Sequence, residues 1–105
     1  MSLQELYREI WKERKHNCTG CGRHLGNEPL LYMFSHTIKK STRPDLKLEK
    51  DNILLECVKC HQWWESRIPH KMKQLKNIKT KMLYIKANDV NLYYKLTNND
   101  KQKLF

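Results

Sequence analysis

Two short cysteine motifs, Cys18-Thr19-Gly20-Cys21-Gly22 and Cys57-Val58-Lys59-Cys60-His61, decide how this chain folds. Each has the Cys-x-x-Cys spacing with which two thiolates occupy adjacent corners of a tetrahedral metal site. Gly22, directly after the second cysteine, permits the tight turn that points backbone N–H groups at the sulfurs. The two pairs predict a structural zinc site with four ligands, Cys18, Cys21, Cys57 and Cys60. The alternative is two pairs of buried or redox-active thiols.

The chain has 105 residues, of which 39% are hydrophobic. A core this small is marginal for a self-sufficient fold, so zinc binding is expected to contribute directly to folding. No apolar segment near Met1 resembles a signal peptide. Paired cysteines in such a chain favour metal thiolates over disulfides and predict a cytoplasmic protein.

The charge balance predicts a polyanionic partner. Lysine and arginine number 21 against 11 aspartates and glutamates, a formal net charge of +10. Neutralising phosphates supplies most of the non-specific affinity for nucleic acids. An anionic membrane is the alternative, but no apolar run approaches the ~20 residues of a spanning helix. We therefore expect DNA, and no membrane, as the partner.

Residues 1–16 are expected to be one amphipathic helix over positions 3–15. Ser2, followed three residues later by Glu5, forms a capping-box pattern at its start. The apolar positions recur at helical spacing: Leu3, Leu6, Tyr7, Ile10 and Trp11.

Residues 17–68 contain both cysteine pairs and a strand–loop–strand–helix pattern. An apolar, aromatic run over 30–34 predicts a strand that ends at Ser35-His36. A basic loop follows, and a second strand region is expected over 46–55, with Asp51-Asn52 at a turn. Residues 57–67 predict a helix that Pro69 ends.

Residues 69–105 are expected to be a basic helical extension. One helix is predicted over 69–86, broken by Asn88-Asp89, and Thr97 with Asp100 could cap a last short one. Its apolar stripe must pack on this domain or on a second copy, which would make a homodimer. The stripe comprises Met72, Leu75, Met82 and Ile85. The lysines expected to contact DNA are Lys71, Lys73, Lys76 and Lys79.

The segment over 17–68 places His36 at the end of a strand, Asn52 in the next strand region and His61 on the following helix. This order and spacing resemble the HNH endonucleases of the ββα-metal fold. The two Cys-x-x-Cys turns, or zinc knuckles, are similar to those of phage recombination nucleases of the endonuclease VII type. The segment from Ser35 to Cys60 is similar to lambdoid-phage nucleases of the NinG type. The resemblance covers roughly residues 17–67.

The resemblance implies a small α+β fold: a treble-clef-like ββα-metal core stapled by the four-cysteine zinc, with flanking N- and C-terminal helices. It implies metal-dependent endonucleolytic hydrolysis of DNA in recombination, repair or packaging, with branched DNA as one candidate substrate. A phage protein of this kind would act in the cytoplasm of a bacterial host.

Catalytic roles follow from the same resemblance. His36 corresponds to the general base that deprotonates the attacking water, Asn52 to the residue that holds the loop and His36 in place, and His61 to a ligand of the catalytic metal. Glu65 lies one helical turn beyond His61, and a carboxylate there favours Mg²⁺ or Mn²⁺.

One position departs from the family pattern. Many HNH enzymes carry Asp or His immediately before the base as a metal ligand, and this chain has Ser35. The hydroxyl could bind through water, the metal could rest on His61 and Glu65, or metal binding could have degraded.

Lys39, Lys40 and Arg43 follow the base and are expected to contact phosphates beside the scissile bond, unless they form an ordinary solvated loop.

Two other functions fit the sequence. A non-catalytic zinc module that binds nucleic acid explains the charge, the zinc and Ser35, but not the HNH order. A protein-interaction adaptor would use the C-terminal stripe.

Overall fold

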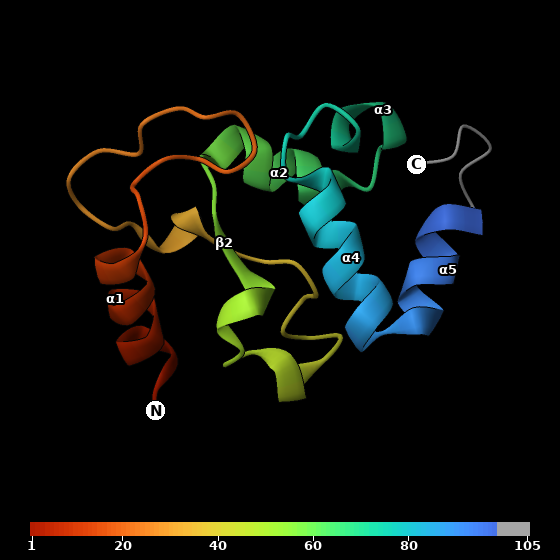
Figure 1. The fold of residues 1–105 in the computed structure, drawn as a ribbon, viewed down its shortest axis with the longest axis horizontal. Helices are drawn as coiled ribbons and strands as arrows, with labels where there is room; N and C mark the ends of the chain where they lie inside the picture. Colours follow the sequence, from red (N-terminus) through yellow and green to blue (C-terminus); the bar gives the residue numbers. More distant parts are fainter. Residues whose placement is uncertain (99–105) are drawn as a thin grey trace.

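The computed structural model describes residues 1–98, and it shows a small α+β protein (Figure 1). Its sheet is a two-stranded antiparallel hairpin, in which β1 (Phe34–His36) pairs with β2 (Ile53–Leu55). Phe34 lies opposite Leu55, and His36 lies opposite Ile53. The helices described are α1 (Leu3–Glu13), α2 (Val58–Ser66), α3 (Pro69–Met72), α4 (Ile78–Asn88) and α5 (Val90–Asn98).

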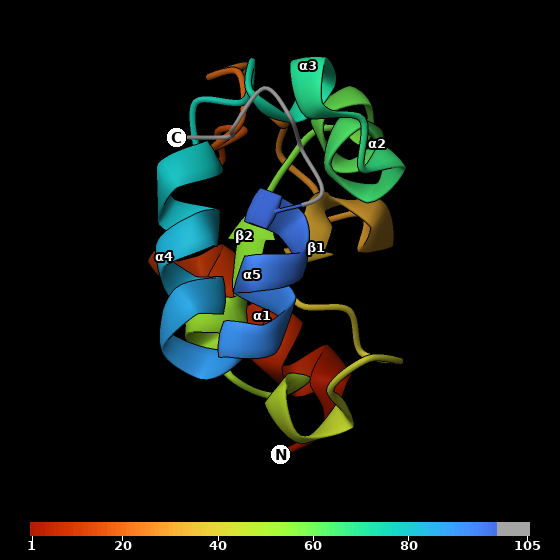
Figure 2. The ribbon, with the colours of Figure 1, turned by 90° about the vertical axis from the view of Figure 1, so that its right-hand side faces the viewer.

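The hairpin lies between the N-terminal and C-terminal helices. Figures 1 and 2 show α1 on one side of the strands and α4 with α5 on the other, while α2 and α3 cover one end. Every residue of β1 is buried. The buried apolar residues, from Leu6 on α1 to Ile85 on α4, form one cluster. The three segments expected from the sequence therefore share a single core.

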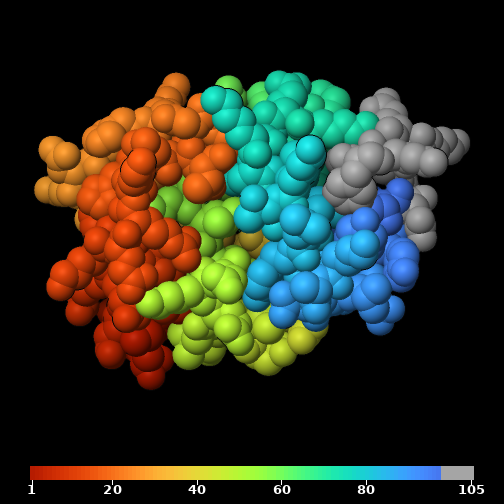
Figure 3. Space-filling view, in the orientation of Figure 1, coloured from red at the N-terminus to blue at the C-terminus, as the bar shows by residue number. Residues whose placement is uncertain are grey.

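Helix α1 begins as predicted, because the Ser2 hydroxyl accepts a hydrogen bond from the Glu5 N–H at 3.1 Å. It ends at Glu13, two residues earlier than predicted, because Arg14 is extended. The Arg14 guanidinium donates to the carbonyls of Lys50 and Ile53. These bonds tie α1 to the start of β2, and Figure 3 shows the two segments side by side on the surface.

Both strands are shorter than predicted. Leu31–Met33 forms a 3-10 turn, so that β1 starts only at Phe34. In the second region, two further 3-10 turns, Pro44–Leu46 and Lys50–Asn52, replace most of the expected strand. The sequence predicts a strand region over 46–55, but tertiary hydrogen bonds of Asn52 hold most of this segment in turns.

Helix α2 agrees with the prediction to within one residue. Cys57 precedes it, and Arg67 ends it in the left-handed conformation at φ 58°. Trp64 of α2 is fully buried, and its indole N–H donates to the Thr37 carbonyl at 3.2 Å. This bond fixes α2 against the residue that follows β1.

The single helix predicted over 69–86 is wrong: the chain leaves the helix after Met72 and re-enters it at Ile78. The Lys76 N–H donates instead to the Gly20 carbonyl of the first knuckle, at 2.9 Å. The apolar stripe was expected to pack on this domain or on a second copy. It packs on this domain, because its four residues are all buried within the chain.

The last helix starts at Val90 rather than near Thr97, whose hydroxyl bonds to the Tyr93 carbonyl inside α5. Asp100, the other half of that expected cap, lies outside the described residues. Within residues 1–98, each helix is too short or too polar to cross a bilayer.

Candidate metal centre and cleft

The four cysteines converge as the spacing predicted. Their Sγ atoms all lie within 4.8 Å of one another, and no disulfide joins them. A tetrahedral zinc with Zn–S bonds of about 2.3 Å requires sulfurs about 3.8 Å apart. The Sγ atoms of Cys21 and Cys57 lie at 3.8 Å. The cluster therefore has the composition and the dimensions of a structural zinc site.

The electrostatics of the cluster call for a cation. Burial raises the pKa of the Cys18 and Cys60 thiols, so neither would ionise readily by itself. At Cys21, the backbone N–H of Arg23 is the main cause that lowers the pKa to about 7. Gly22 makes this turn at φ +84°. A bound Zn²⁺ supplies the positive charge that four clustered thiolates require.

Gly20 leaves room for the metal centre. A Cβ on this residue would lie 2.8 Å from Cys60 Cβ and 2.9 Å from Cys60 Sγ. Such distances do not occur between real side chains, so one knuckle can approach the other only because residue 20 has no side chain.

A buried charged network, which the sequence reading missed, lies behind this centre. The Lys81 ammonium contacts the Glu56 carboxylate at 2.9 Å, and both side chains are 0% exposed. Asn77 donates to the same carboxylate at 2.8 Å and to the Thr19 hydroxyl at 2.8 Å. Lys81 belongs to the basic helix that the sequence predicts over 69–86, and nothing in the sequence pattern indicates its burial. The network connects α4 to Thr19 of the first cysteine motif and to Glu56, which directly precedes the second.

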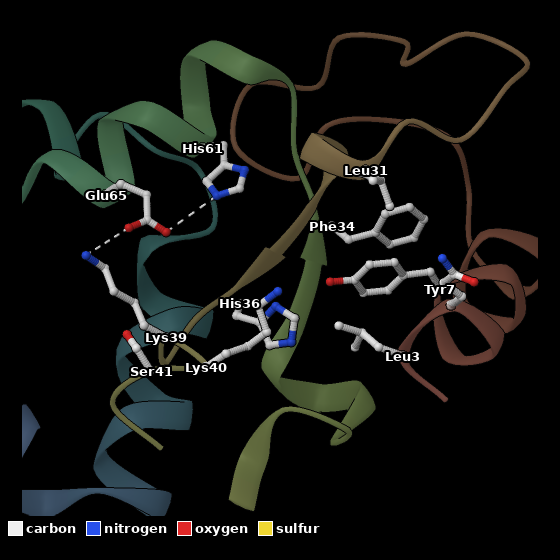
Figure 4. Close-up of a pocket in the computed structure, with 11 residues that line it drawn as sticks. Leu3, Tyr7, Leu31, Phe34, His36, Lys39, Lys40, Ser41, His61 and Glu65 are labelled. Atoms are coloured by element: carbon white, nitrogen blue, oxygen red, sulfur yellow. Dashed lines mark ion pairs between the residues drawn. The ribbon is translucent and has the colours of Figure 1, made fainter. Parts of the chain in front are cut away.

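Of the residues predicted for the catalytic site, His36, His61 and Glu65 line one cleft of about 640 Å³, whereas Asn52 and Ser35 do not. His36 comes from β1, His61 and Glu65 come from α2, and Lys39 and Lys40 come from the loop after β1 (Figure 4). The opposite wall is apolar and includes residues that the sequence reading had assigned only to the core or to a strand. These residues are Leu3, Tyr7, Leu31 and Phe34.

His36 is held in one orientation, with 6% of its surface exposed. Its Nε2 lies 3.0 Å from the Lys47 carbonyl oxygen, which can only accept a hydrogen bond. Nε2 therefore carries the proton, and Nδ1 keeps the free lone pair. Burial, more than the nearby Lys40 and His61, lowers the pKa of His36 below its usual value. The imidazole is therefore neutral at pH 7.

Asn52 is fully buried and binds both ends of the loop that follows His36. Its Oδ1 accepts from the Ile38 N–H at 2.7 Å, and its Nδ2 donates to the carbonyls of Ile38 and Leu46 at 3.0 and 3.2 Å. The Asn52 carbonyl also accepts from the Thr37 N–H at 2.7 Å. This side chain fixes the backbone on both sides of Lys39 and Lys40.

His61 and Glu65 offer two ligand atoms to the cleft. The His61 Nδ1 lies 2.7 Å from the Tyr32 carbonyl oxygen, so Nδ1 carries the proton and Nε2 is free. That Nε2 lies 3.4 Å from Glu65 Oε1, while the other carboxylate oxygen contacts Lys39 at 3.0 Å. In residues 1–98, the four cysteines are the only group of three or more metal-ligating side chains. His61 and Glu65 are a two-ligand pair.

Ser35 lies apart from these residues. It is fully buried and does not line the cleft, since successive side chains of β1 point to opposite faces. Its Oγ has no hydrogen-bond partner in the described part of the chain. The structure therefore does not bring Ser35 together with His61 and Glu65.

The basic residues expected to bind DNA differ in their surroundings. Lys40, Lys76 and Lys79 are exposed, whereas Lys71 and Lys73 are half-buried. Arg43 forms ion pairs with Asp45 at 2.7 Å and with Asp89 at 3.3 Å. Its guanidinium thus holds the loop after β1 to the junction of α4 and α5.

Comparisons with models of protein families, with curated proteins and with solved structures found no match to this chain.

Proposed function

We propose that this protein is a metal-dependent HNH endonuclease that hydrolyses DNA phosphodiesters, with a ββα-metal core made of β1, β2 and α2. One observation carries the proposal: His36, with a free Nδ1, shares a cleft with the His61–Glu65 pair and with two lysines. Such a cleft combines a base, ligands for a cation and positive charge for a phosphate.

His36 is the general base of this proposal. Because its pKa is lowered, the imidazole is neutral at pH 7 and Nδ1 can take a proton from water. Lys47 holds the ring through Nε2, and Asn52 holds the loop that leads to Lys47. Lys40 is exposed at the same cleft and can bind a phosphate oxygen.

His61 and Glu65 would hold the catalytic cation, Mg²⁺ or Mn²⁺. When bound, it stabilises charge on the phosphate and on the leaving oxygen. Two protein ligands suit a hard cation whose other positions are filled by water and substrate phosphate. Lys39 contacts Glu65 at 3.0 Å, so a cation held by His61 and Glu65 would compete with the Lys39 ammonium for this carboxylate.

The test is a cleavage assay on supercoiled plasmid and on a synthetic four-way junction, with Mg²⁺, Mn²⁺ or EDTA. We expect wild type to cut in the presence of the cation, and His36→Ala to bind DNA but not to cut. The matched control is His70→Ala, because His70 is an exposed histidine of α3 that does not line the cleft. If wild type and His36→Ala cut at the same rate, the proposal is wrong.

A second function is a zinc-stapled nucleic-acid-binding module without catalysis. The Lys39–Glu65 ion pair and the position of Ser35 favour it, because both leave fewer ligands for a cation. Salt-sensitive DNA binding without any metal-dependent cutting would support this alternative.

A further inference from the structure

Tyr7 contributes an unassigned polar group to the cleft, although it comes from the N-terminal helix. Its ring stacks on Phe34 with a centroid distance of 4.2 Å and an interplanar angle of 8°. It meets the His36 ring edge-on at 6.3 Å. Figure 4 shows Leu3 on the other side of Tyr7 and the hydroxyl pointing toward the hairpin.

The Tyr7 hydroxyl has no hydrogen-bond partner among residues 1–98. No residue in the described part of the chain forms a hydrogen bond with it, and burial alone raises the pKa of Tyr7. The phenol therefore keeps its proton at neutral pH. Because the stacked ring is only 9% exposed, the ring and its C–O bond have a fixed direction, and the hydroxyl hydrogen can turn toward a ligand oxygen.

The surroundings of the hydroxyl fit an anionic ligand. Two lysines, Lys39 and Lys40, line the same cleft against one carboxylate, Glu65, which pairs with Lys39 at 3.0 Å, so the charge of the lining is positive. A phenol O–H is a good donor to a phosphate oxygen, and a preformed donor costs no rearrangement during the reaction.

We propose that the Tyr7 hydroxyl is a catalytic donor that binds a non-bridging oxygen of the phosphate attacked by the water that His36 activates. This inference rests on the proposed nuclease function. The hydrogen bond strengthens as charge builds on that oxygen in the transition state, so it lowers the barrier more than it tightens DNA binding.

The first test is Tyr7→Phe, which keeps the stacked ring and removes only the oxygen. We expect the single-turnover cleavage rate to fall roughly 10- to 100-fold, as for a hydrogen bond to a charged group. DNA affinity in EDTA, zinc content, melting temperature and the acidic limb of the pH–rate profile should not change. Tyr94→Phe is the control, since Tyr94 is exposed on α5 and does not line the cleft.

A second test separates contact from structure. Sulfur replaces each non-bridging oxygen of the mapped scissile phosphate in turn. We expect one of the two sulfur substitutions to slow wild type more than it slows Tyr7→Phe, since the variant has already lost the donor. Equal slowing of both proteins at both positions would mean that Tyr7 acts only through the fold, and it would overturn the proposal.

The outcomes also separate this inference from the nuclease function. If wild type cuts, His36→Ala does not, and Tyr7→Phe cuts within twofold of wild type, the role of Tyr7 is refuted and the nuclease function stands. If wild type does not cut at all, both are refuted.

Discussion

Replacing Lys81 with methionine should destabilise the protein strongly, because it leaves the Glu56 carboxylate without its cation. The two groups are 2.9 Å apart and 0% exposed, so water cannot substitute for the ammonium. Methionine keeps most of the length of the apolar stem and removes the charge, and with it the cation–π contact of the Lys81 Nζ with the Trp64 ring, at 4.4 Å from the centroid. The substitution therefore tests the ammonium rather than the packing of the stem.

The cost can be worked from the chemistry of the buried carboxylate. In the variant, Glu56 must stay charged without a cation or take up a proton. A glutamate in an unfolded chain titrates near pH 4.3, so protonation at pH 7 costs about 3.7 kcal/mol, at about 1.36 kcal/mol per pH unit. This agrees with the ~3–5 kcal/mol typical of breaking a buried ion pair. At pH 5 the same protonation costs only about 1 kcal/mol.

The assay is urea unfolding followed by circular dichroism with saturating zinc, at pH 7 and at pH 5. We expect Lys81→Met to lose about 3–4 kcal/mol at pH 7 and much less at pH 5. The double variant Glu56→Gln/Lys81→Met should regain at least half of the loss, because a neutral amide can still accept from Asn77. Lys79→Met, an exposed change on α4, should stay within about 0.5 kcal/mol of wild type.

Three results would refute this reasoning. A loss below about 1 kcal/mol at pH 7 would mean that the carboxylate is not isolated by the change. A loss that does not depend on pH would exclude protonation of Glu56 as its cause. A double variant no more stable than the single one would place the effect in packing rather than in charge.

Three further predictions concern the metal centre and the cleft. Gly20→Ala should lower both the melting temperature and the zinc content measured by mass spectrometry, because its Cβ would overlap Cys60. The control Gly26→Ala has open space around it, so it should keep the zinc and cost only about 1 kcal/mol of stability. The acidic limb of the pH–rate profile should lie below pH 6.5, because burial lowers the pKa of His36, and a limb above 6.5 would contradict this cause. For the same reason the folded protein binds fewer protons than the unfolded chain below pH 6.5, so the stability due to His36 should be lost as the pH falls through its lowered pKa. Asn52→Ala should cost several kcal/mol in urea unfolding, since it removes three buried hydrogen bonds, and it should reduce cleavage as well; unchanged stability would refute its role in holding the loop.

The sequence by itself determined the features that local patterns encode. The Cys-x-x-Cys spacing predicted the four-sulfur cluster, because two residues between ligands suffice to orient a pair of thiols on one metal. The start of α1 followed from Ser2 and Glu5, and α2 followed from its helical pattern and Pro69. A cap or a knuckle depends only on near neighbours, so it can be read from a few residues.

Only the tertiary structure decided the features that depend on residues distant in the sequence. Lys81 belongs to a lysine-rich helix, and only Glu56, 25 positions earlier, makes its burial possible. The break between α3 and α4 follows from the bond between Lys76 and Gly20 rather than from a helix-breaking residue. Tyr7 had the spacing of a core residue, and only the hairpin shows that its hydroxyl opens into the cleft. A sequence pattern records which side of a helix is apolar, but the segment that meets that side decides which polar groups become buried, paired or available to a ligand.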